Sequence, residues 1–195
     1  MMVEKWESES SVELADHKIF KIRQDIRRSP RTGNKHPFVV LEAGDWINVI
    51  PVTPAGKVVM IHQFRHGTAE ITLEIPGGMV DAEDGDPAVA ARRELLEETG
   101  YAVDELVHLG TSAPNPAFLN NHIHTYLALN ARQVAQPVFD GAEDIAVKEV
   151  ALDHLSDLVR GGQITHALVI VAFYFFHQYQ EQNPDWFESM IFHAG

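Results

Sequence analysis

The chain has 195 residues, of which 45% are hydrophobic and 22% are charged, and this composition is that of an ordinary globular protein. Its 28 acidic and 15 basic residues give a net charge of −13, which argues against non-specific binding to nucleic acid or to an anionic membrane. There is no cysteine, the N-terminus is acidic rather than signal-like, and the longest apolar run, residues 167–176, is too short to cross a bilayer. We therefore expect a cytoplasmic protein of moderate size, with no nucleic-acid or membrane partner.

Short apolar runs separated by turn residues dominate the chain, and only a few stretches have helical character. Strands are expected within residues 12–50, around a basic loop at 28–37, and at 46–52, 57–64, 71–75, 122–129 and 145–152. Helices are expected at about 87–99, 153–160 and 164–181. Because strands and helices do not alternate regularly, this order favours an α+β fold with a mixed sheet over a Rossmann-type sheet.

The helix expected at 87–99 has clear ends and an unusual distribution of charge. Asp86 is suited to the N-cap and Pro87 to the first helical position, while Gly100 fits the left-handed residue just past the end. Three carboxylates fall within an arc of roughly 100° near its C-terminus: Glu94, Glu97 and Glu98. Carboxylates at that end oppose the helix dipole and repel one another, so the cluster predicts a bound cation.

The Pro-Gly-Gly turn, the acidic loop after it and the helix pattern R-E-x-x-E-E-x-G together resemble the Nudix hydrolases, whose pattern is G-x5-E-x7-R-E-U-x-E-E-x-G-U with U an aliphatic or aromatic residue. The matching positions are Gly78, Arg93, Glu94, Leu95, Glu97, Glu98, Gly100 and Tyr101. Residues 46–49, 63–65 and 73–78, and a proline 16 positions after Gly100 (Pro116), resemble the branch that cleaves ADP-ribose and other nucleoside diphosphate sugars. The resemblance implies the Nudix α/β/α sandwich with a mixed sheet and an N-terminal β segment.

The loop before the helix departs from the Nudix pattern, because it is one residue longer between Gly78 and Arg93. Counting forward from the glycine places Asp84 at the position of the first glutamate, whereas counting back from the arginine places Gly85 there. Either Glu83 or Asp84 is expected to substitute for that glutamate.

The resemblance also implies two or three Mg²⁺ or Mn²⁺ ions that bridge the substrate diphosphate, and such hard cations prefer oxygen ligands. The expected metal ligands are Glu94, Glu97, Glu98, a backbone carbonyl of Gly77 or Gly78, and Glu143 from the acidic loop 139–145. The expected catalytic residues are Glu97, Glu98, Glu143 and Arg93, with Arg93 facing away from the cluster centre and orienting a glutamate. The base stays open between Asp140, Glu143 and a helix glutamate, because Gly141 stands at the family's base position.

Four residues are expected to bind substrate: Arg65, Glu74, Trp46 and Pro116. By resemblance Arg65 contacts the phosphates or the terminal sugar, and a plain surface arginine is the alternative. Glu74 is expected either to bind a metal-bound water or the sugar, or to be a buried charge paired with an arginine. Trp46 is expected to stack on a nucleobase or to belong to the core, and Pro116 precedes a loop that resembles the family's substrate-specificity region.

The sequence therefore predicts a Mg²⁺-dependent pyrophosphohydrolase that cleaves a nucleoside diphosphate sugar; ADP-ribose would give AMP and ribose 5-phosphate. We expect an N-terminal β segment at 1–45, exchanged across a homodimer, and a Nudix domain at 46–195. Two alternatives remain. One is another nucleotide substrate, such as GDP-mannose, NADH or a dinucleoside polyphosphate. The other is a non-catalytic Nudix-fold ligand sensor.

Overall fold

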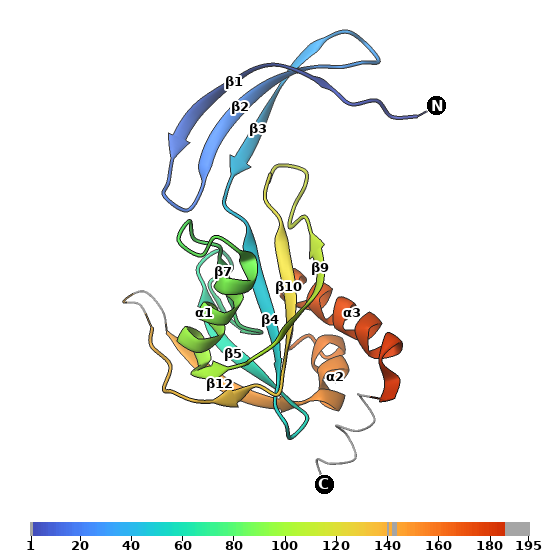
Figure 1. Ribbon diagram of the computed structural model, residues 1–195. Coiled ribbons are helices and arrows are strands. Elements are labelled where there is room, and N and C mark those ends of the chain that lie inside the picture. The colour runs from blue at the N-terminus through green and yellow to red at the C-terminus, as the bar shows by residue number, and fades with distance from the viewer. Residues whose placement is uncertain (1, 140, 142–143, 186–195) are drawn as a thin grey trace. The chain divides into compact units, whose positions relative to one another are not determined.

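The computed structural model describes residues 2–139, 141 and 144–185 of the chain (Figure 1). The chain divides into two compact units. We call Met1–Asp45 together with Ala113–His122 the N-terminal unit, and Trp46–Ser112 together with Ile123–Gly195 the larger unit. Within the described ranges, no helix is long and apolar enough to cross a membrane.

The N-terminal unit is a three-stranded antiparallel sheet in the order β1-β2-β3 (Figure 1). Its strands are β1 (Glu7–Asp16), β2 (Lys21–Arg28) and β3 (Lys35–Glu42). Most of β1 and β3 is exposed, and even the apolar Val12 and Val39 are 59% and 51% exposed. Because so little of it is buried, this sheet depends on its backbone ladder and on cross-strand ion pairs such as Arg28–Glu9.

The larger unit is built on a seven-stranded sheet in the order β12-β5-β4-β10-β9, with β6 beside β5 and β7 beside β4. Strands β4 and β10 run parallel, and the other pairs in this sheet are antiparallel. The strands are β4 (Trp46–Val52), β5 (Lys57–Arg65), β6 (Glu70–Glu74), β7 (Gly77–Met79), β9 (Leu106–Ser112), β10 (Ile123–Leu129) and β12 (Ile145–Ala151). Two short strands, β8 (Tyr101–Ala102) and β11 (Arg132–Gln133), pair separately.

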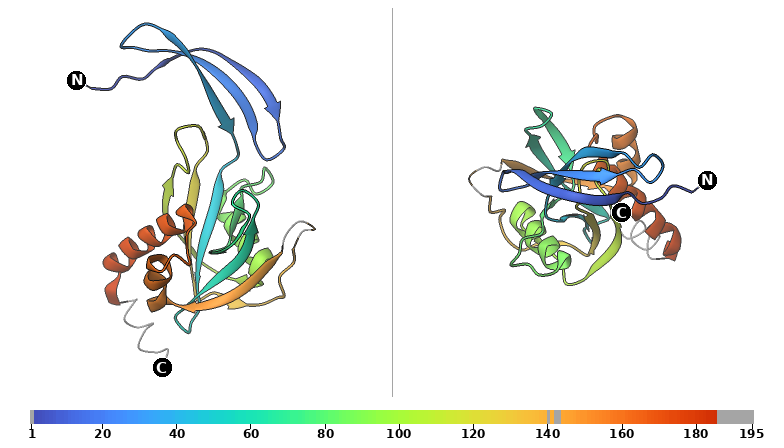
Figure 2. Two further views of the ribbon diagram at one scale, coloured as in Figure 1. Left: turned by 180° about the vertical axis from the view of Figure 1, so that it is seen from behind. Right: turned by 90° about the horizontal axis from the view of Figure 1, so that it is seen from above.

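Helices cover both faces of this sheet and give three layers (Figures 1 and 2). Helix α1 (Pro87–Thr99) lies on one face, and α2 (Leu155–Arg160) and α3 (Ala167–Gln182) lie on the other. Strand β4 serves both layers, because Ile47 and Val49 pack in the α1 core whereas Ile50 and Val52 pack in the α3 core. The predicted α+β fold, an α/β/α sandwich with a mixed sheet, is confirmed.

Element boundaries differ from the sequence predictions mainly near the C-terminus. Helix α3 begins at Ala167 rather than 164, because His166 still has an extended backbone with ψ 116°. Helix α2 begins at Leu155, after a 3₁₀ turn over Leu152–His154. Strand β9 was not predicted, since its exposed and half-buried positions do not alternate regularly.

Candidate active site

Helix α1 begins and ends as its cap residues predict. Asp86 Oδ1 accepts the Ala88 N–H at 2.8 Å. Gly100 adopts φ 73° and donates its N–H to the Leu96 carbonyl, which is the left-handed termination that a glycine favours. These caps fix the helix register, and therefore the face on which its three glutamates stand.

Two of these glutamates lie against the glycine turn of β7. The Gly77 N–H donates to Glu98 Oε2 at 3.0 Å, and Glu98 is only 2% exposed. A Cβ on Gly78 would come within 2.2 Å of Glu94 Oε1, so the glycine leaves the space that this carboxylate occupies. Glu97 stands further out, with its side chain 47% exposed. The turn and the helix together place Glu94 and Glu98 beside β7, which pairs with the central strand β4.

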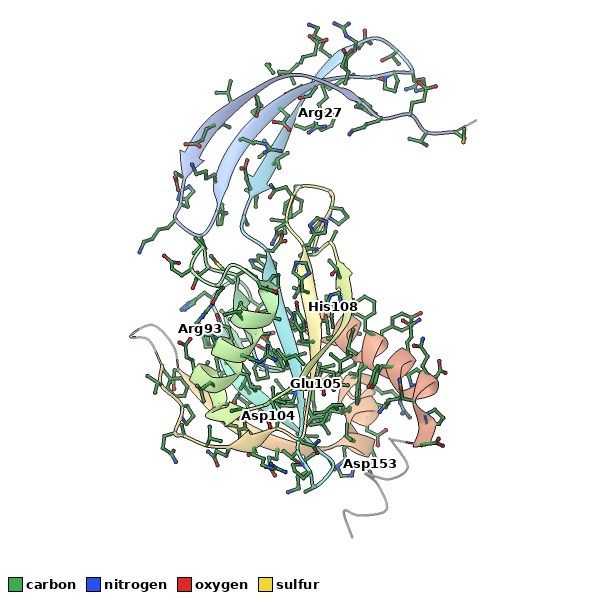
Figure 3. All side chains as sticks on the ribbon, viewed as in Figure 1. Arg27, Arg93, Asp104, Glu105, His108 and Asp153 are labelled. Carbon is green, nitrogen blue, oxygen red and sulfur yellow. The ribbon has the colours of Figure 1, made fainter. Side chains whose placement is uncertain are left out.

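Arg93 projects from α1 (Figure 3), and its guanidinium pairs with two of the three helix glutamates, Glu94 and Glu97. Its guanidinium donates to Glu94 Oε1 at 2.9 Å and to Glu97 Oε2 at 3.3 Å. It also donates to Asp84 at 3.0 and 2.8 Å, and these bonds raise the pKa of Arg93 above its ordinary value. The expectation that Arg93 faces away from the cluster centre is therefore wrong. The guanidinium instead ties the glutamates to the preceding loop.

Asp84 is the loop carboxylate that pairs with this arginine. Both of its oxygens accept from Arg93, one oxygen also accepts the Asp81 N–H at 2.8 Å, and its side chain is only 6% exposed. Glu83 is exposed. Gly85, with φ 66°, then turns the chain toward α1. The longer loop thus brings an aspartate, with its shorter side chain, within reach of Arg93.

We expect Asp84→Asn to destabilise the protein by about 1 kcal/mol at pH 7, because it removes the charge from a bidentate pair. The hydrogen bonds from Arg93 hold the pKa of Asp84 below its usual value. The pair therefore stabilises the fold fully near neutral pH and loses that effect as the pH falls below about 4. Denaturant titrations of both proteins at pH 7 and pH 3.5 check this. A stability difference that is the same at the two pH values would contradict it.

The donors at this site suit a hard divalent cation. The carboxylates of Glu94 and Glu98 and the carbonyls of the glycine turn are oxygen ligands, which Mg²⁺ prefers. Within the part of the chain that the structure describes, no three Asp, Glu or His side chains already converge as a ligand set. The predicted ligand Glu143 and the candidate base Asp140 lie outside the described residues.

A second charged cluster lies where β5 and β6 meet. Arg65 donates from Nε and Nη2 to both oxygens of Glu74 at 2.7 Å, and Thr72 Oγ1 donates to Glu74 at 2.6 Å. Glu74 is 2% exposed; burial alone would raise its pKa, but the bonds from Arg65 and Thr72 outweigh burial and hold it below the usual value. The structure thus has the second arrangement considered for Glu74, a buried charge paired with an arginine.

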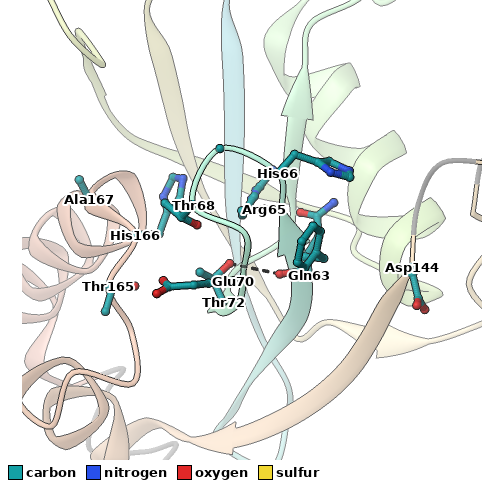
Figure 4. Close-up of a pocket in the computed structure, with 12 residues that line it drawn as sticks. Gln63, Arg65, His66, Thr68, Glu70, Thr72, Asp144, Thr165, His166 and Ala167 are labelled. Atoms are coloured by element: carbon teal, nitrogen blue, oxygen red, sulfur yellow. Dashed lines mark hydrogen bonds between the residues drawn. The ribbon is translucent and has the colours of Figure 1, made fainter.

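Two adjoining hollows flank this ion pair. The turn pocket, of about 280 Å³, is lined by the glycine turn together with Trp46 and Asn48. The polar pocket, of about 850 Å³, is lined by residues of β5, β6, the loop between them and the start of α3 (Figure 4). Arg65 and His166 line both pockets, so the two hollows meet at the ion pair.

The structure brings together most, but not all, of the predicted site residues that it describes. Trp46, Arg65 and Glu74 line the turn pocket with Gly78, next to the helix glutamates. Pro116 belongs instead to the N-terminal unit. Sequence reasoning missed the pocket residues Gln63, Thr165 and His166 as candidates. Of these residues only Gln63 had a sequence signal, the Gln63-Phe64-Arg65 run. Thr165 and His166 had none, because the start of α3 reaches the pocket only through tertiary packing, with His166 4.0 Å from Glu74 of β6.

A glutamate-bearing helix held against a glycine turn, within an α/β/α sandwich, is the arrangement that the Nudix pattern in the sequence predicts. Comparison with known proteins agrees: a family description of the NUDIX domain matches residues 45–173, and the chain belongs to the Nudix family. The chain is 30% identical over 157 residues to a methanol dehydrogenase activator of Bacillus methanolicus, covering 80% of this chain and 83% of that relative. It is 31% identical over 147 residues to an ADP-ribose pyrophosphatase of Bacillus subtilis strain 168, covering 75% of each.

Among solved structures, a crystal structure of an ADP compounds hydrolase has a TM-score of 0.81 with this chain, over 94% of this chain and 98% of that one. At 17% identity this likeness supports the fold alone. The predicted family, fold and enzyme class are confirmed by these findings. Nudix hydrolases generally need a divalent metal such as Mg²⁺.

Proposed function

We propose that the protein hydrolyses the pyrophosphate bond of a nucleoside diphosphate sugar and releases a nucleoside monophosphate and a sugar phosphate. With ADP-ribose the products are AMP and ribose 5-phosphate. The observation that carries this proposal is the placement of Glu94 and Glu98 against the Gly77–Gly78 turn. The relative named as an ADP-ribose pyrophosphatase supports this class of substrate.

The helix glutamates supply the metal-binding side of the proposed site. Bound Mg²⁺ or Mn²⁺ neutralises the diphosphate and lowers the pKa of a water molecule. Arg93 fixes Glu94 and Glu97 by hydrogen bonds, and Asp84 fixes Arg93 in turn, so these carboxylates need little reorganisation. The proposed ligands of two or three ions are Glu94, Glu97, Glu98, the Gly78 carbonyl and Glu143.

The remaining roles concern proton transfer and substrate contacts. We assign proton acceptance to Glu97, whose side chain is the most exposed of the helix glutamates, with Glu143 as the second candidate. Arg65 keeps 40% of its side chain exposed while paired to Glu74, and this face is proposed to donate to a phosphate or sugar oxygen. Trp46, in the turn pocket, is the proposed stacking partner of the base. Pro116 is proposed to shape the specificity loop.

A substrate panel tests the proposal directly. Mononucleotide release with Mg²⁺ should be measured on ADP-ribose, GDP-mannose, NADH and a diadenosine polyphosphate, each with a parallel sample in excess chelator. We expect the highest kcat/KM on a nucleoside diphosphate sugar and no release with chelator. If the protein turns over none of these compounds but binds one of them with nanomolar affinity, it is a non-catalytic ligand sensor rather than a hydrolase.

We further propose that the protein works in the cytoplasm as a homodimer and has no nucleic-acid partner. The net charge of −13 supports the last point, because binding phosphates without metal requires a basic face. Exposed apolar side chains on the N-terminal sheet, among them Val12 and Val39, support burial against a second copy. Sedimentation of the purified chain across a concentration series tests the dimer.

A further inference from the structure

The polar pocket has a lining that resembles neither a phosphate site nor an apolar cleft. Its one arginine, Arg65, already carries two short bonds to Glu74, so its charge is neutralised locally. The carboxylates of Glu70 and Asp144 also line the pocket, together with hydroxyls such as that of Thr165 (Figure 4). The pocket therefore has hydrogen-bonding groups but, apart from Arg65, neither lysine nor arginine for an additional phosphate; its other basic side chains are the imidazoles of His66 and His166.

Several buried acceptors around the two pockets lack a partner. Among the described residues five buried side-chain atoms have no hydrogen-bond partner, and three of these belong to residues that line the pockets. They are Gln63 Oε1 and His166 Nδ1 in the polar pocket and Asn48 Oδ1 in the turn pocket. An unsatisfied buried polar atom costs roughly 1–3 kcal/mol, and a ligand hydroxyl that meets these atoms after a small side-chain movement offsets that cost.

His166 adds to this acceptor character. Burial lowers the pKa of its imidazole, and the nearby Arg65 adds to that effect against the opposing influence of Glu74, so the ring is neutral near pH 7. Its Nε2 is 4.0 Å from Glu74 Oε2. With the ring proton on the Nε2 side, facing that carboxylate, Nδ1 is left as an acceptor. All three unsatisfied atoms then require a donor rather than an anion.

We propose that the polar pocket holds the sugar half of the substrate as an uncharged, hydroxyl-rich group, and that Gln63, Glu70 and His166 reject a sugar carrying a further phosphate. This inference rests on the proposed function and names its substrate more closely. Sugar hydroxyls donate to the unsatisfied acceptors of Gln63 and His166, whereas a second phosphate on the sugar meets Glu70 and Asp144 without a compensating lysine or second arginine. The sugar is assigned to the polar pocket because Arg65 lines both pockets. In the proposed function the diphosphate lies in the turn pocket, on the glycine-turn side of Arg65, so the sugar attached to it extends to the other side.

The test compares ribose 5-phosphate with ribose 1,5-bisphosphate as ligands, because they share the phosphate next to the metal and differ only at the far end of the sugar. Binding is measured by calorimetry with Mg²⁺, and neither ligand has an anhydride to hydrolyse. We expect the wild-type protein to bind the bisphosphate at least about 10-fold more weakly. Gln63→Leu should weaken the binding of ribose 5-phosphate roughly 3- to 10-fold, which is the effect of losing one hydrogen bond.

Replacing a glutamate by lysine inside the pocket, and another outside it, separates the effect of charge in the pocket from the effect of the protein's net charge. Glu70→Lys should bring the affinities for ribose 5-phosphate and ribose 1,5-bisphosphate within about 3-fold of each other. Glu105 is an exposed carboxylate outside the pocket lining, so Glu105→Lys should leave the ratio of these two affinities as in the wild type. Equal wild-type affinities, binding of neither ligand, or the same effect of both lysine variants would overturn the inference. Turnover of ADP-ribose is followed separately. A protein that prefers the monophosphate but does not hydrolyse ADP-ribose would retain the inference and refute the proposed function.

Discussion

Glu98→Gln should lower Mg²⁺-dependent hydrolysis of a nucleoside diphosphate sugar by about 10³-fold, equivalent to about 4 kcal/mol of transition-state stabilisation. Glu98 is 2% exposed and accepts the Gly77 N–H, and an amide oxygen of similar shape can keep that bond. What the amide loses is the negative charge, and charge is what a divalent cation requires of its ligand. The variant should therefore fold normally and fail chemically.

Three measurements make this result specific. Turnover with saturating Mg²⁺ gives the rate loss, Mn²⁺ binding followed by electron paramagnetic resonance gives the loss of affinity, and thermal unfolding reports the fold. Glu97→Gln should also abolish turnover, because Glu97 is assigned to the same site. Glu105→Gln carries the same chemical change at an exposed position and should match the wild type. Unchanged turnover in the Glu98 or Glu97 variant would remove the metal-site assignment.

The best sequence prediction was helix α1, and its success has a local physical cause. Asp86, Pro87 and Gly100 each act on their immediate neighbours, so the predicted span 87–99 is the observed one. Strand β4 was also predicted with its observed bounds, because a strand buried on both faces is a nearly continuous apolar run, interrupted here only by Asn48. Signals that lie within a few residues of the element can be read without knowing the fold.

The elements that escaped prediction lack such local signals. The region in which strands were predicted begins at residue 12 and so includes only the second half of β1 (Glu7–Asp16). Nearly every residue of β1 is exposed, so its sequence shows no alternation between a buried and a solvent face. Strand β7 is three residues long and exists because the glycines pair with β4. Each of these strands is defined by its partner in the sheet, and partners separated in the chain cannot be read from one segment.

In the candidate site, too, residues with a local sequence signal were predicted and residues brought together by the fold were not. The helix glutamates were identified from their spacing, and a buried pair between Glu74 and an arginine was considered in advance; the structure shows that this arginine is Arg65. The direction of Arg93 was predicted wrongly, because helical spacing gives the Cα position and not which carboxylates a long side chain will reach. His166 was missed because 92 positions separate it from Glu74, its neighbour at 4.0 Å.

The two turn glycines provide a sharper test, because the same substitution should have opposite consequences at neighbouring positions. Neither glycine has a positive φ, so each is required for space rather than for backbone conformation. A Cβ on Gly77 would lie 2.5 Å from the Ile47 carbonyl oxygen, which is backbone within the paired strand β4. A Cβ on Gly78 would instead lie 2.2 Å from Glu94 Oε1, the far end of a flexible side chain.

We therefore expect Gly78→Ala to lower kcat by about 10²-fold with little loss of stability, because Glu94 can rotate away but then leaves its place beside the turn. Gly77→Ala should destabilise the protein by about 1–3 kcal/mol, because β4 and β7 must separate to admit the methyl group. Denaturant titration and steady-state kinetics on both variants decide the matter. If Gly78→Ala unfolds the protein as readily as Gly77→Ala, the contact at Gly78 is part of the fold. If Gly78→Ala keeps full activity, Glu94 is not needed beside the turn, and its assignment as a metal ligand fails.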